Sequence, residues 1–101
     1  MASGSADFAY HSTLTASTVD TVTLNDGSEY VTVVNRGGTD EIYFTVDTPT
    51  NEPPSPTVGG ANTYVLPAAI GSLRVASEIG PIVVKLISNG AMAYSVEVIA
   101  P

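Results

Sequence analysis

Short stretches of alternating apolar and polar residues run through most of the chain, and none repeats its apolar residues with the 3.6-residue period of a helix. The stretches are rich in Val, Ile, Thr and Tyr, which favour pleated strands. Turn-forming residues recur about every eight to twelve positions, a spacing typical of a sandwich or a barrel. The pattern therefore predicts an all-β protein.

About eight strands follow from this pattern, and no helix. Within 41–47, Ile42, Phe44 and Val46 share one face, whereas 82–88 is apolar on both faces and predicts a central or covered strand. Asn89-Gly90 predicts a hairpin. The expected strands cover residues 12–17, 18–24, 29–35, 41–47, 62–67, 71–77, 82–88 and 92–100.

Short connections predict antiparallel pairing, since a parallel crossover needs a dozen or more residues. A sheet of this size must bury its apolar face against another layer. We therefore expect an antiparallel β-sandwich, immunoglobulin-like or jelly-roll-like, with a small β-barrel as the alternative.

The domain organisation predicted from the sequence is a single sandwich, residues 15–101, preceded by an N-terminal arm, residues 1–14. The arm carries Phe8, Tyr10 and Leu14, which would be exposed on a monomer if the arm were free. Apolar residues in such a place predict docking onto a neighbour. The alternative is an arm that folds back on its own sandwich.

A proline-rich loop at residues 47–62 interrupts the strand pattern. Proline fixes φ and cannot donate to a β-ladder, so the loop is stiff and does not pair as a strand. Loops longer than about 12 residues are usually functional or disordered. We predict that Pro49, Pro53, Pro54 and Pro56 present a surface to a partner; an extended connector across the end of the sandwich is the alternative.

Charge narrows the possible partners. The net charge is -7, from ten acidic residues against three basic ones. Nucleic-acid binding needs a basic surface that releases counterions, and anionic lipid attracts basic segments, so we expect neither partner. The sequence contains no cysteine, no run of about 20 apolar residues, and no basic and apolar segments of a signal peptide at its start.

Candidate chemistry is sparse in this sequence. His11 is the one histidine, and a Ser-His-Asp triad would have to use it from the N-terminal arm, where a base is not held rigidly. A zinc site needs three or four nitrogen or sulfur ligands. Asp20, Asp26, Asp47 and Glu52 lie in or near expected turns without the spacing of a calcium loop. We expect no enzyme activity, no metal and no cofactor.

Four segments carry a resemblance to a known family: "EIYFTVD" at 41–47, "PTVGGANTYVLPAAIGSLRV" at 56–75, "VVKLIS" at 83–88 and "YSVEV" at 94–98. Together they resemble a small β-sandwich module of structural proteins in tailed bacteriophages, especially phages of actinobacteria. The resemblance runs from Val19 to Val98. The chain departs from it by inserting "TPTNEPPS" at 48–55, where the family pattern has a short link.

The resemblance implies a capsid decoration protein. Such a cementing subunit would be made in the bacterial cytoplasm, bind the major capsid protein on the outside of the head, and associate with itself, often as a trimer. Two alternatives stay open: a host-recognition or glycan-binding module of a tail fibre or spike, and a ring component of the tail or connector.

Overall fold

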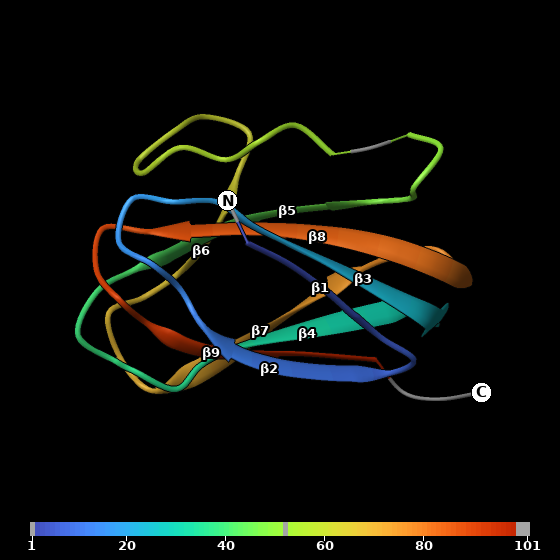
Figure 1. Cartoon of the computed structure of the whole chain (residues 1–101), viewed down its shortest axis with the longest axis horizontal. Coiled ribbons are helices and arrows are strands. Elements are labelled where there is room, and N and C mark those ends of the chain that lie inside the picture. The colour runs from blue at the N-terminus through green and yellow to red at the C-terminus, as the bar shows by residue number, and fades with distance from the viewer. Residues whose placement is uncertain (1, 52, 99–101) are drawn as a thin grey trace.

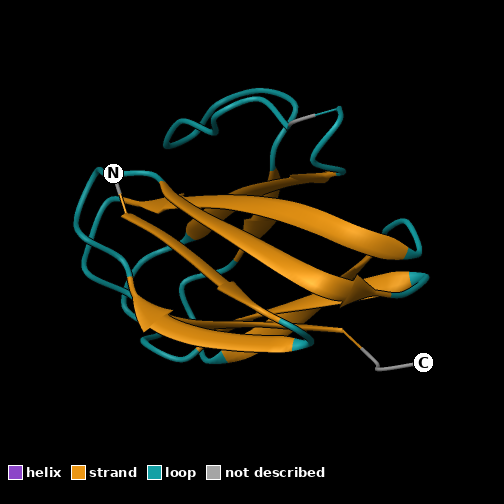
Figure 2. Cartoon of the chain, turned by 45° about the vertical axis from the view of Figure 1, so that its right-hand side comes forward, coloured by secondary structure: helices purple, strands orange, loops and turns teal. Residues whose placement is uncertain are grey.

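The computed structural model describes residues 2–51 and 53–98. These residues form nine strands in two facing sheets (Figures 1 and 2). The described residues contain no helix that could cross a membrane. The strands are β1 (Ala2–Ala6), β2 (Ala9–Thr13), β3 (Asp20–Gly27), β4 (Tyr30–Asn35), β5 (Ile42–Asp47), β6 (Tyr64–Leu66), β7 (Gly71–Ala76), β8 (Gly80–Ser88) and β9 (Ala93–Val98). The predicted all-β sandwich is confirmed.

The strand order is β1-β3-β8-β5-β6 in one sheet and β2-β9-β4-β7 in the other. Every pairing is antiparallel except that of β1 with β3, which is parallel. The exception arises because β2, which lies in the other sheet, separates β1 from β3 and returns the chain to the end where β1 began.

The core lies between the sheets and consists of every second residue of the inner strands. Phe44, Tyr94 and Leu86 are among its largest fully buried side chains. The face predicted from the alternation in β5 agrees with the burial, because Ile42 and Phe44 belong to the core and Val46 packs against it. The cluster contains Leu14, Val22, Leu24, Val31, Val33, Ile42, Phe44, Leu66, Val75, Ile82, Val84, Leu86, Met92, Tyr94, Val96 and Val98.

The N-terminal segment differs from the expected free arm. Residues 2–6 pair with β3 at the edge of the five-stranded sheet, and residues 9–13 pair with β9 at the edge of the four-stranded sheet. The alternative, an arm folded back on its own sandwich, is what the structure shows. No boundary between arm and sandwich exists at residue 14, because Leu14 is a core residue with 1% exposure.

The strand that is apolar on both faces, β8, is central in its sheet, as predicted. Its inward residues join the core, and its outward residues Val83 and Ile87 are also buried. The proline-rich loop between β5 and β6 lies above this outward face (Figures 1 and 2). Its Pro53 and Pro56 are buried, and the Thr45 hydroxyl donates a hydrogen bond of 2.7 Å to the Pro54 carbonyl. The loop therefore covers the outer face of the sheet.

The predicted turn at Asn89-Gly90 has a different role, and β3 is longer than predicted. Asn89-Gly90 does not close a hairpin, because β8 and β9 belong to different sheets. Residues 25–27 belong to β3, which continues to Gly27 through an irregularity in its register with β8. A Cβ at Gly27 would overlap the carbonyl oxygen of Gly80, so glycine permits the close approach of these two strands.

Leu14→Ala tests the incorporation of the N-terminal segment. Truncating a fully buried leucine leaves a cavity, and we expect the free energy of unfolding to fall by about 2–5 kcal/mol, measured by urea denaturation. The neighbouring Thr15 is exposed, so Thr15→Ala should change it by less than about 0.5 kcal/mol. Equal stability of the two variants would show that Leu14 lies on a free arm.

Candidate functional site

The predicted interface residues of the N-terminal segment lie in three different environments. Phe8 is 53% exposed in the two-residue connection from β1 to β2. Tyr10 is half-buried, and its ring covers Gly4 so closely that a Cβ there would overlap it. Leu14 is in the core and cannot contact a partner in the folded chain. Phe8 alone of the three presents a large apolar surface to solvent.

The four prolines predicted to contact a partner fall into a buried pair and an exposed pair. Pro53 and Pro56 are buried within the chain, whereas Pro49 and Pro54 are exposed. The hydrogen bond from Thr45 to the Pro54 carbonyl lies between these buried prolines in the sequence and holds this part of the loop beside β5. Pro49 and Pro54 keep their predicted role as contact candidates.

His11 is held more firmly than the sequence predicted. It lies on β2 opposite Ser95 of β9, and its Nδ1 is 2.6 Å from the Ser95 hydroxyl. No hydrogen bond to a carboxylate orients the ring among the described residues, and Ser95 is only 3% exposed. A serine nucleophile needs a base that is oriented by a third group and an accessible oxygen. The pair is therefore a structural contact between strands.

Asp20 is a buried acid that the sequence analysis placed in or near a turn. It lies on β3 with 3% exposure, and the Tyr94 hydroxyl donates a hydrogen bond of 2.9 Å to its Oδ2. Its Oδ1 is buried without a partner among the described residues. Burial raises the pKa of Asp20, and the hydrogen bond from Tyr94 opposes that shift. Burial and the neighbouring Asp20 likewise raise the pKa of Tyr94.

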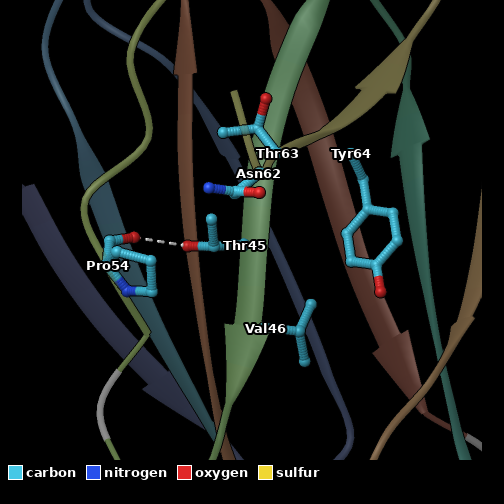
Figure 3. A pocket seen from close by; sticks show the side chains of 6 residues that line it. All are labelled: Thr45, Val46, Pro54, Asn62, Thr63 and Tyr64. Carbon is cyan, nitrogen blue, oxygen red and sulfur yellow. Dashed lines mark hydrogen bonds between the residues drawn. The ribbon is translucent and has the colours of Figure 1, made fainter. Parts of the chain in front are cut away.

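Hydroxyl, amide, apolar and aromatic side chains line a cavity at the edge of β5. We call it the β5 slot; its volume is about 410 Å³. Figure 3 shows Pro54 on one side of β5 and Tyr64 on the other, with Asn62 and Thr63 at the upper end. Its lining residues are Thr45, Val46, Pro54, Asn62, Thr63 and Tyr64.

Local contacts hold the walls of the β5 slot in place. The Tyr64 ring lies 5.4 Å from the ring of buried Phe44, measured between centroids. Asn62 has a φ of 60°, in the left-handed region, which turns the chain before β6 begins, and the Thr63 hydroxyl donates to the Gly60 carbonyl at 2.9 Å. Sequence analysis missed this site because its residues come together only when the loop folds over β5.

The β5 slot suits binding rather than bond breaking. None of its lining residues is charged, and none is a histidine, cysteine or lysine. Hydroxyl, amide and aromatic groups can orient a ligand through hydrogen bonds and apolar contact. Across the described residues, no group of three or more His, Cys, Asp or Glu side chains could hold a metal ion.

No protein-family model matches the chain, and comparison with curated proteins gives no match. Solved structures do share its fold. One is a carbohydrate-binding module found in a sugar cane soil metagenome, in complex with cellopentaose and a gadolinium ion. It has a TM-score of 0.62 and 10% identity, over 96% of this chain and 90% of the module.

Two further solved structures are similar in fold. A periplasmic inhibitor of g-type lysozyme from Aeromonas hydrophila has a TM-score of 0.55 and 15% identity, over 94% of this chain and 92% of the inhibitor. The pre-peptidase C-terminal domain of a collagenase from Bacillus anthracis has a TM-score of 0.54 and 13% identity, over 95% and 91%. At such identities the likeness establishes the β-sandwich fold alone.

Asp20→Asn tests the burial of the Asp20 carboxylate. Because the pKa is raised by folding, the folded state holds the Asp20 proton more tightly than the unfolded chain does. The contribution of Asp20 to stability is thus greatest below its unfolded pKa of about 3.9 and is lost as pH rises through the folded pKa. We expect Asp20→Asn to be more stable than the wild type at about pH 7, and the difference to shrink towards about pH 3.

Thermal unfolding across this pH range measures the effect. Asp26→Asn is the matched control, because Asp26 lies on the same strand but is exposed, and it should leave stability within about 0.5 kcal/mol of the wild type. A loss of stability in Asp20→Asn at about pH 7 would show that the charged carboxylate stabilises the fold.

Proposed function

We propose that the chain is a non-enzymatic structural subunit of a phage virion, a decoration protein that binds the outside of the head and reinforces contacts between capsomers. The observation that carries this proposal is the position of its two most exposed large apolar side chains. Ile70 is 76% exposed and Ile79 is 77% exposed. Ile70 directly precedes β7 and Ile79 directly precedes β8.

These two side chains lie at opposite ends of the sandwich. Ile70 lies beside the end of β4, because the start of β7 pairs there, and Ile79 lies beside the end of β3, because the start of β8 pairs there. Strand β7 runs from the first of these ends towards the second, so about the length of β7 separates the two isoleucines. At about 3.3 Å per residue this separation is roughly 20 Å. Exposed apolar side chains at both ends suit a subunit that contacts two neighbours at once.

The two ends differ in charge. Asp7, Asp26, Glu29 and Glu78 lie in or beside the loops at the Ile79 end, together with exposed Phe8. At the Ile70 end, Arg36 follows β4 and is offset by Asp40 and Glu41 just before β5, so the acidic excess is smaller there. Arg74 and Lys85 lie within strands. An acidic rim around apolar residues favours a partner with a basic rim and disfavours a second copy of the same end. We therefore assign the Ile79 end to the capsid and the Ile70 end to association between copies.

Ile79→Asn and Ile70→Asn test this assignment, each serving as the control for the other. We expect Ile79→Asn to weaken binding to undecorated heads at least tenfold, about 1.4 kcal/mol, in a co-sedimentation assay. Ile70→Asn should instead reduce the oligomer, expected to be a trimer, by light scattering. Heads that bind both variants like the wild type would contradict the proposal, and immunogold labelling on the tail would favour the ring alternative.

A glycan-binding module of a tail fibre or spike is the second candidate. Its support is the fold shared with the carbohydrate-binding module, together with the aromatic ring and polar side chains of the β5 slot. If a glycan stacks on Tyr64, Tyr64→Ala should weaken glycan binding about tenfold or more in a calorimetric titration. An exposed tyrosine elsewhere, Tyr30, provides the matched control Tyr30→Ala. A glycan array without a hit would remove this candidate.

A further inference from the structure

The β5 slot is an open strand edge. β5 pairs with β8 from Ile42 to Asp47, but β6 pairs with β5 only from Ile42 to Phe44. In the described part of the chain, residues 45–47 therefore have a strand partner on one side only. Alternate residues of a strand direct their N–H and C=O groups to opposite sides, so part of this main chain faces the slot.

The walls of the slot lie on the two faces of the sheet, and the plane of the sheet is left open between them. Figure 3 shows Pro54 beside the outer face of β5 and Tyr64 beside the inner face. The hydrogen bond from Thr45 to the Pro54 carbonyl fixes the outer wall, and the contact with Phe44 fixes the inner one. A strand entering between them would direct alternate side chains to the two walls.

The loop of this chain is poorly suited to fill its own slot. Pro53, Pro54 and Pro56 lack the N–H group that a strand donates to its neighbour. The Thr45 hydroxyl holds the Pro54 carbonyl beside the outer face of β5, so this part of the loop lies over the face of the sheet rather than in its plane. The proline-rich insertion thus keeps the edge of β5 open while it shapes one wall.

We infer that the β5 slot receives an extended segment of a partner polypeptide, which adds to the five-stranded sheet beside Thr45–Asp47, in line with β6. This inference rests on the proposed role as a subunit that binds a neighbouring protein. Three residues of open edge give a weak single contact, and many copies on one particle multiply it.

Charge identifies the kind of segment. The lining residues of the slot are uncharged, and the Asp47 carboxylate at its end accepts hydrogen bonds from the Thr48 N–H and the Asn51 side chain. No segment of this chain has basic residues on both flanks, because its three basic residues lie far apart in the sequence, at positions 36, 74 and 85. The occupant is therefore a β-branched, uncharged segment with basic flanks, from a different protein.

Nuclear magnetic resonance on the full chain tests this inference with a defined probe. The probe is a blocked heptapeptide with the sequence Lys-Thr-Val-Thr-Val-Thr-Lys. Its control is the same peptide N-methylated at alternate residues, which keeps the side chains and loses the main-chain donors on one edge. At saturation we expect the slot-facing amides of residues 45–47 to exchange their hydrogens about tenfold more slowly, and the control peptide to give no such protection.

A variant pair provides a second, independent measurement. Pro54→Trp places a large side chain at the wall of the slot and keeps the carbonyl that Thr45 contacts, so it should weaken peptide binding about tenfold or more. Ser55→Trp changes the next residue of the same loop, which is exposed and outside the slot lining, and should bind like the wild type. Amide chemical shifts of the core strands, away from the substituted residue, check that both variants keep the wild-type fold.

Three outcomes would overturn the inference. Equal binding of the N-methylated peptide would show that no strand is added. Protection of residues 45–47 that rises with protein concentration, without peptide, would identify a second copy as the occupant. Shifts at the slot with cellopentaose but not with the peptide would assign the slot to a glycan. Head binding is a separate readout: if heads are bound while the peptide is not, the inference fails and the proposed function stands.

Discussion

Alternation of the chain between two facing sheets is the constraint on which the rest of the molecule depends. Every connection between consecutive strands crosses from one sheet to the other, except the connection from β5 to β6. Separating the sheets would therefore extend almost every turn and expose the apolar core at once. The hydrogen bond from Tyr94 on β9 to Asp20 on β3 lies within this layer and ties the sheets with a polar contact. The buried faces supply the stability, and the crossings fix which faces meet.

Much of the fold could be predicted because one face of most strands is buried. The alternation in β3, β4, β5 and β9 follows directly from that burial, and the two apolar faces of β8 follow from its central place beneath the loop. β1 could not be predicted, since "ASGSA" contains no large apolar residue and is a strand only because β3 offers it an edge. The Asn89-Gly90 turn was wrongly interpreted as a hairpin because a tight turn joins strands equally well across two sheets.

The candidate site was less predictable than the fold. Phe8 and two of the four prolines are exposed as expected, whereas Leu14, Pro53 and Pro56 are buried by contacts that no local pattern reveals. The β5 slot depends on where β6 begins, and that is decided by a left-handed Asn62 and a loop that folds over a distant strand. The burial of Asp20 did have a sequence signal. Asp20 lies two residues before Val22 and four before Leu24, so in a strand its side chain is on the same, core-facing side as theirs.

The single connection that stays within one sheet has a practical consequence. Because it leaves β5 and returns to the adjacent β6, its length can change without altering the path of any other strand. Three of its residues, Thr57, Val58 and Gly59, are exposed, and a Cβ added at Gly59 would meet no other atom within 4 Å. A guest sequence inserted there would leave the pairing of β5 with β6 and β8 unchanged, so this connection offers a position for displaying a foreign epitope.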